Sequence, residues 1–146
     1  MINEFKGKYY FLSNFYETPI VYDGLTYQNN EAAFQAAKTT SYEEREKFTY
    51  LIPSEAKRLG RKVALRSDWE EVKDKIMYEI CKAKFSQWAN LKHLLLETGD
   101  TYLEEGTTGW HDNIWGNCNC EKCKNIPGEN RLGKILMKVR EELRNE

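Results

Sequence analysis

Apolar residues recur every three or four positions along two stretches of the second half of the chain, which is the period of one helix face. These positions are Val72, Ile76, Ile80 and Ala83 in the first stretch, and Leu132, Leu136, Val139 and Leu143 in the second. The first stretch predicts a helix that runs to about residue 88, and the second predicts a C-terminal helix. A further helix is predicted from Asn90 to Glu97, ended by Thr98 and Gly99.

The first 28 residues are rich in Tyr, Phe, Ile and Val, which favour strands. Asp23 and Gly24 separate two such runs, and this dipeptide is a strong signal for a tight hairpin turn. We therefore expect residues 20–22 to pair with residues 25–27. The fold class predicted from the whole pattern is α+β, mainly helical, with a small N-terminal β-hairpin.

Short polar motifs predict where the remaining helices begin and end. Ser41 with Glu44, and Ser67 with Glu70, match the capping-box pattern, so we expect one helix over residues 42–50 and another directly after residue 67. Pro53 is placed to open a further short helix, and Gly60 to end it.

A polar stripe lies in the helix predicted to begin at Asn29 or Asn30. Glu31, Gln35 and Lys38 are spaced by four and three residues, and the positions between them are mostly alanine. One interpretation is that Glu31 only favours the helix N-terminus and that the stripe faces solvent. The other is that the stripe lines a pocket, in which an ionised Glu31 would suit a general base.

Composition limits the classes of protein to consider. The 146 residues fit one domain, 1–146, with its own core. The net charge of −1 gives no global attraction to DNA or membranes, and no apolar run approaches the roughly 20 residues of a membrane span. Without a signal-peptide pattern at the N-terminus, we expect a cytoplasmic protein that does not bind membranes.

A glycine-containing polar segment from Gly106 to Gly128 is long for a loop in a small domain, and such loops are usually functional. Cys118, Cys120 and Cys123 have spacings found in zinc sites, but zinc normally takes four ligands. A fourth would have to be His111, Cys81 or His93. Reduced thiols without metal are the alternative, and we expect no cofactor unless this cluster binds zinc.

Several separated motifs together resemble the NADAR family, also called YbiA-like. The resemblance extends from about residue 9 to residue 143. The motif residues are Phe11 to Phe15; Tyr27, Glu31, Gln35 and Lys38; Leu59, Gly60 and Arg61; Leu65, Arg66, Trp69 and Lys73; Asp112, Trp115 and Gly116; and Gly128, Asn130, Leu132, Gly133, Leu136 and Met137. The cysteine segment is an insertion relative to the shortest family pattern.

The resemblance implies an N-glycosidase that hydrolyses a ribose C1′–N bond. The implied substrates are ADP-ribose on guanine in DNA or a ribosylamino intermediate of riboflavin synthesis. The expected partners are therefore ADP-ribose-type or ribosyl-phosphate compounds, and ADP-ribosylated DNA. A non-catalytic ADP-ribose or NAD-binding module, and a zinc-dependent nucleic-acid module, are the alternatives. The pattern leaves the oligomeric state open.

Carried over by position, the resemblance assigns catalytic roles to Glu31, Asp112 and Trp69. The expected substrate-binding residues are Ser13, Asn14, Lys38, Arg61, Trp115, Gly116, Asn130 and Lys134. The residue types suit the reaction, since one carboxylate can stabilise an oxocarbenium-like sugar or activate water while a second group protonates the leaving base. Indole rings can stack on the heterocycle, and cationic side chains can hold phosphate.

Overall fold

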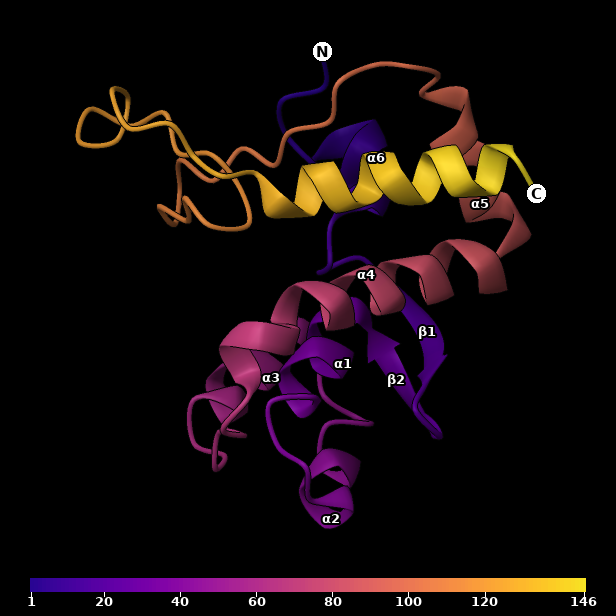
Figure 1. Ribbon diagram of the computed structural model, residues 1–146, viewed down its shortest axis with the longest axis vertical. Helices are drawn as coiled ribbons and strands as arrows, with labels where there is room; N and C mark the ends of the chain where they lie inside the picture. Colours follow the sequence, from indigo (N-terminus) through magenta and orange to yellow (C-terminus); the bar gives the residue numbers. More distant parts are fainter. The chain divides into compact units, whose positions relative to one another are not determined.

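The computed structural model describes residues 1–146 and contains six α-helices, one 3-10 helix and one two-stranded antiparallel sheet. The predicted α+β class, mainly helical with a small β-hairpin, is therefore confirmed (Figure 1). In chain order the elements are η1 (Gly7–Leu12), β1 (Glu17–Tyr22), β2 (Leu25–Asn29), α1 (Asn30–Ala36), α2 (Tyr42–Glu46), α3 (Pro53–Gly60), α4 (Trp69–Gln87), α5 (Ala89–Glu97) and α6 (Arg131–Arg144). No helix has both the length and the apolar character needed to cross a bilayer.

The chain forms two compact units, one of residues 14–89 and one that combines residues 1–13 with 90–146. In the first unit, β1 and β2 form the predicted hairpin and extend beyond the predicted pairs. Asp23 and Gly24 have φ of 50° and 86°, as a tight turn with two left-handed residues requires. Pro19 lies in the irregular part of the ladder, where its missing N–H costs no regular strand pairing.

Helix α1 follows the hairpin directly and lies in the interior of the same unit. The side chain of Asn29 caps it by accepting a hydrogen bond from the Ala32 N–H at 2.7 Å. All seven helical residues are buried, and small side chains such as Ala32 and Ala36 allow α3 and α4 to pack closely against it. The interpretation that the stripe of Gln35 faces solvent is therefore wrong.

Three boundaries differ from the prediction. Helix α1 ends at Ala36, so Lys38 lies in the following turn and not on the helix. Helix α2 ends at Glu46 and residues 47–50 form turns, although Ser41 caps it as expected by accepting from the Glu44 N–H at 3.3 Å. Helix α4 begins at Trp69 without a side-chain cap, so the Ser67 box is wrong; Glu70 instead forms an ion pair with Lys73 at 2.8 Å.

In the second unit, the amphipathic α6 supplies much of the core. The predicted stripe of Leu132, Leu136, Val139 and Leu143 is buried throughout. Arg140, also buried, donates hydrogen bonds to Thr98 Oγ1 and the Thr101 carbonyl and so ties α6 to the end of α5. The segment after α5 forms parallel bridges between Ile2 and Leu103 and between Gly106 and Asn117, and residues 107–130 otherwise form turns and irregular loop.

Candidate active site

Glu31 is the predicted catalytic carboxylate of the first unit. It lies in the first turn of α1 and only 8% of it is exposed. Gln35, one turn later, donates from Nε2 to Glu31 Oε1 at 2.8 Å, which fixes the carboxylate orientation. Gln35 Oε1 is buried and accepts no hydrogen bond within the protein.

A cation and an aromatic surface lie next to this carboxylate. Lys38 Nζ is 6.0 Å from the ring centroid of Trp69, and the Trp69 ring packs on Phe34 with centroids 5.0 Å apart. Burial lowers the pKa of Lys38, the negative charge of Glu31 opposes that shift, and the cations Arg61 and Lys57 reinforce it. Glu31, Lys38, Trp69 and Arg61 thus belong to one electrostatic neighbourhood, although they come from distant parts of the sequence.

Two predicted binding residues at the start of the chain have structural contacts. Asn14 accepts through its backbone carbonyl from the Glu31 N–H at 3.1 Å, and its side-chain oxygen accepts from Asn30 Nδ2 at 3.1 Å. These bonds position the start of α1, and hence Glu31. Ser13 is buried and ends η1, with its N–H donating to the Tyr10 carbonyl at 2.9 Å. Substrate binding by either residue stays a prediction.

Asp112 belongs to the other unit, in the long loop before α6. Its Oδ1 accepts from the backbone N–H groups of Ile114 and Trp115, at 2.8 and 2.9 Å, and so forms the turn that presents Trp115. The other carboxylate oxygen takes no part in these two bonds. Asp112 therefore shapes the loop and is also a half-buried carboxylate. That it acts together with Glu31 in catalysis stays a prediction.

Glycine is required at position 116 by close packing of the backbone. A Cβ there would lie 2.4 Å from the Glu105 carbonyl oxygen and 2.3 Å from Thr107 Cγ2, distances that real Cβ atoms do not adopt. Its main role in this structure is therefore to let two loop segments touch, a role that the sequence motif alone does not reveal.

Asn130, predicted to bind substrate, anchors the loop to α6. It has left-handed backbone torsions, with φ of 49°, and is 2% exposed. Its Oδ1 accepts from the Glu105 N–H at 3.1 Å, and its Nδ2 donates to the Leu103 carbonyl at 2.9 Å. Lys134 is exposed in the first turn of α6 and remains available to bind an anion.

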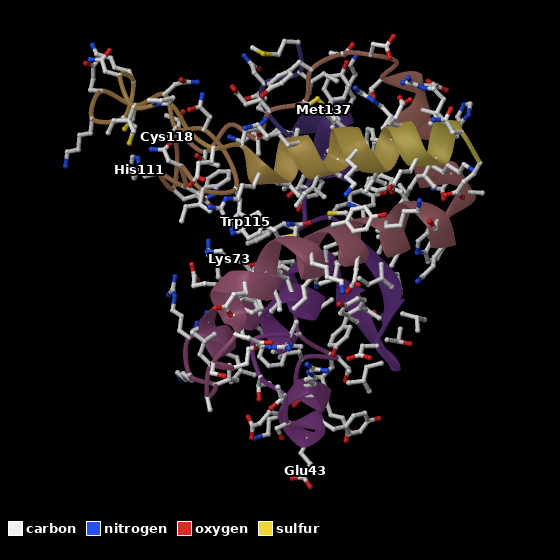
Figure 2. The ribbon with its side chains drawn as sticks, in the orientation of Figure 1. Glu43, Lys73, His111, Trp115, Cys118 and Met137 are labelled. Carbon is white, nitrogen blue, oxygen red and sulfur yellow. The ribbon has the colours of Figure 1, made fainter.

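The cysteine segment brings together more donors than its three thiols. The ligand atoms of four residues lie within 4.8 Å of one another: His111, Cys118, Cys120 and Cys123. Figure 2 labels His111 and Cys118 in this loop. Contacts among the thiols lower the pKa of Cys120 to about 6, while burial raises that of Cys118 to about 11. Of the three candidates for a fourth donor, the structure selects His111.

The hollow beside this loop is too small for a nucleotide. It encloses about 160 Å³, below the roughly 300 Å³ at which ligand pockets begin, and contains no predicted site residue. Its lining residues are Asn3, Glu4, Lys6, Gly106, Thr108, Gly109 and Asn119.

Comparison with known proteins assigns the chain to a family. The sequence profile of the NADAR domain matches residues 2–144, which is nearly the whole chain and includes every candidate residue named above. The chain belongs to the NADAR domain family. The matched range includes residues of both compact units.

Relatives of this NADAR chain carry names that describe enzymes. It is 40% identical over 134 residues to the N-glycosidase YbiA of Escherichia coli, covering 90% of this chain and 79% of that protein. An N-glycosidase of Nostoc punctiforme is 45% identical over 95 residues, 64% of this chain and 56% of that protein. A riboflavin biosynthesis protein of Vibrio vulnificus is 37% identical over 136 residues, with 91% of this chain but only 35% of that protein covered.

The NADAR fold is also seen in a solved relative. The NMR structure of the E. coli protein YbiA matches with a TM-score of 0.82 and 36% identity, and the match covers 99% of this chain and 88% of that one. The predicted NADAR resemblance is therefore confirmed for both sequence and fold.

Proposed function

We propose that this NADAR protein is an N-glycosidase that hydrolyses the bond between ribose C1′ and a nitrogen of its leaving group. The observation that carries the proposal is the buried carboxylate of Glu31, oriented by Gln35 and accompanied by the ammonium group of Lys38. The names of relatives that are 40 and 45% identical support the same reaction class.

In this reaction water adds to C1′, the C1′–N bond breaks, and the leaving nitrogen takes a proton. Positive charge develops on the sugar before water attacks, so an oriented carboxylate can stabilise it or deprotonate the water. We assign this role to Glu31, because Gln35 holds it in place and its burial excludes competing solvent. Asp112 is assigned to proton transfer with the leaving group.

The other candidate residues have binding roles in this proposal. The Trp69 indole, 7% exposed and packed on Phe34, is assigned to contact the heterocycle, and the cations Lys38 and Arg61 can hold phosphate. Such a set suits a ribosyl phosphate, and the two substrates to compare are a ribosylamino intermediate of riboflavin synthesis and ADP-ribose attached to guanine in DNA.

Replacing Glu31 by glutamine tests the proposal. Glutamine keeps the shape and the hydrogen bond from Gln35 but removes the charge, so turnover of the better substrate should fall about 100-fold or more while the protein stays folded. Glu43→Gln, at an exposed site on α2, is the matched control and should keep full activity (Figure 2). Full activity of Glu31→Gln would remove Glu31 from the reaction.

Product release separates this proposal from the non-catalytic alternative. The wild-type protein is incubated with each substrate, and the free base and ribosyl product are quantified by mass spectrometry. Binding of ADP-ribose without release of either product would indicate a reader of ADP-ribose and contradict the assignment as an enzyme.

A further inference from the structure

The loop between Gly106 and Asn130 contains a cluster of donors that the proposed glycosidase chemistry does not use. Its members are the imidazole of His111 and the thiols of Cys118, Cys120 and Cys123. Three thiols and one imidazole form one of the common ligand sets of structural zinc. We propose that these four residues bind one zinc ion in a tetrahedral Cys3His site.

The four donors are near enough to one another to approach this geometry. Tetrahedral zinc with Zn–S bonds of about 2.3 Å keeps its sulfur ligands about 3.8 Å apart. In this structure all four ligand atoms lie within 4.8 Å of one another, and His111 Nδ1 is 3.2 Å from Cys118 Sγ. A contraction of about 1 Å, within reach of small side-chain rotations, therefore completes the coordination shell.

The loop backbone holds the donors in place through bonds of its own. The His111 N–H donates to the Thr107 carbonyl at 2.6 Å, and the Cys118 N–H donates to Asn113 Oδ1 at 2.8 Å. The Cys123 N–H donates to the Cys120 carbonyl at 3.0 Å, which forms a turn between the last two thiols. These bonds fix the backbone from which the donors project, which lowers the entropy cost of coordination.

His111 has an unfavourable backbone conformation, whose free-energy cost another interaction must offset. Its φ of 58° lies in the left-handed region, which is unfavourable for a residue other than glycine. This torsion turns its imidazole toward Cys118 and places it among the three thiols. A metal bond from the imidazole accounts for why histidine, and not glycine, occupies this position.

A disulfide does not account for the same cluster. One disulfide would join two of the three thiols and leave the third thiol and the imidazole without a partner, whereas all four donors converge here. Four protein ligands leave no open position on the metal, so the zinc is structural and does not activate water.

Zinc here would restrain the part of the loop that carries Asp112 and Trp115. Asp112 directly follows His111, and the Asn113 side chain bonds to the Cys118 N–H. Loss of the metal should therefore loosen the Asp112 turn. This consequence for catalysis rests on the proposed function, but the presence of zinc does not.

Metal analysis of the whole 146-residue chain tests the proposal. After expression with zinc and removal of loosely bound ions, elemental analysis should find one zinc per chain. Cobalt substitution should give the thiolate charge-transfer and tetrahedral d–d absorption bands of a cobalt–sulfur site. Less than stoichiometric zinc after purification and zinc addition, or iron in its place, would overturn the assignment.

Matched variants identify the ligands. Cys123→Ser and His111→Ala should lose the zinc, while Cys81→Ala and His93→Asn, a thiol and an imidazole outside the cluster, should keep one equivalent. Retention of the zinc and of an unchanged cobalt spectrum by both cluster variants would also overturn the site. If a cluster variant does not fold, the cobalt spectrum of the wild-type chain still decides, because it reports sulfur coordination directly. Because no substrate is involved, an inactive protein with one zinc would support this site and contradict only the proposed function.

Discussion

At the scale of single residues, several predicted site positions combine two roles. Asn130 and Gly116 lie within the motif that the sequence associates with substrate, yet their contacts join loop segments to each other. Asn14 likewise positions α1 through its carbonyl. A residue of this kind affects catalysis through the position of a neighbour, so its substitution should alter folding and activity together. Glu31 differs, because its carboxylate is itself oriented by Gln35 for the proposed chemistry.

Asp112 allows these two roles to be separated experimentally. In Asp112→Asn the side-chain oxygen can still accept from the N–H groups of Ile114 and Trp115, so the turn is kept and only the charge is lost. In Asp112→Ala both bonds are lost. If the carboxylate transfers a proton, the asparagine variant should lose about 100-fold in kcat/KM with an unchanged Tm, and the alanine variant should also lose stability. An asparagine variant with wild-type kcat/KM would restrict Asp112 to shaping the loop.

At the scale of elements, the features that the sequence predicted well depend only on residues close to one another in the chain. The hairpin turn at Asp23 and Gly24 needs only two left-handed residues, and the stripe of α6 needs only its own periodicity. The end of α1 and the start of α4 depend on what packs against them, so local patterns failed there. Gly60 shows the same limit. The sequence predicted that this glycine ends a helix, but did not reveal that it lies against the Gln35 side chain of α1.

Gly60→Ala should reveal this contact between α3 and α1. Alanine usually stabilises a helix by up to about 1 kcal/mol relative to glycine. Here the new Cβ would lie 2.0 Å from Gln35 Oε1 and 3.1 Å from Gln35 Cβ, so the amide that orients Glu31 must move. We expect a net destabilisation of about 1–3 kcal/mol and reduced turnover.

Urea unfolding and steady-state kinetics measure both effects of the Gly60 change. Gly109→Ala is the control, because nothing lies within 4 Å of its added Cβ, and it should leave both quantities unchanged. A Gly60→Ala protein that is more stable than wild type and fully active would show that Gln35 can move without consequence for Glu31.

At the scale of the whole molecule, the buried charge of Lys84 is a cost that the sequence did not reveal. It lies in the last turn of α4, where a lysine is normally solvated, yet it is 0% exposed. Its Nζ lies 5.3 Å from the Tyr16 ring centroid and 5.0 Å from that of Phe85. Burial lowers the pKa of Lys84 to about 7, and the nearby Cys81 opposes this shift only in part.

This shift makes the stability of the fold depend on pH with a defined sign. Between about pH 7 and the normal lysine pKa of 10.5, the unfolded chain keeps a proton that the folded chain has released. The free energy of unfolding contributed by Lys84 should therefore rise with pH across this window, by at most about 1.4 kcal/mol per unit. Below pH 7 both states are protonated, and the full cost of the buried charge remains.

Lys84→Met removes this titration while filling a similar volume. Relative to wild type, the variant should be most favoured at and below about pH 7 and should lose that advantage steadily as the pH rises toward 10. Urea unfolding at several pH values measures the difference, and Lys75→Met, at an exposed position of the same helix, should show little dependence on pH. A constant difference between Lys84→Met and wild type would mean that Lys84 keeps its proton in the folded protein, held by a partner strong enough to offset its burial.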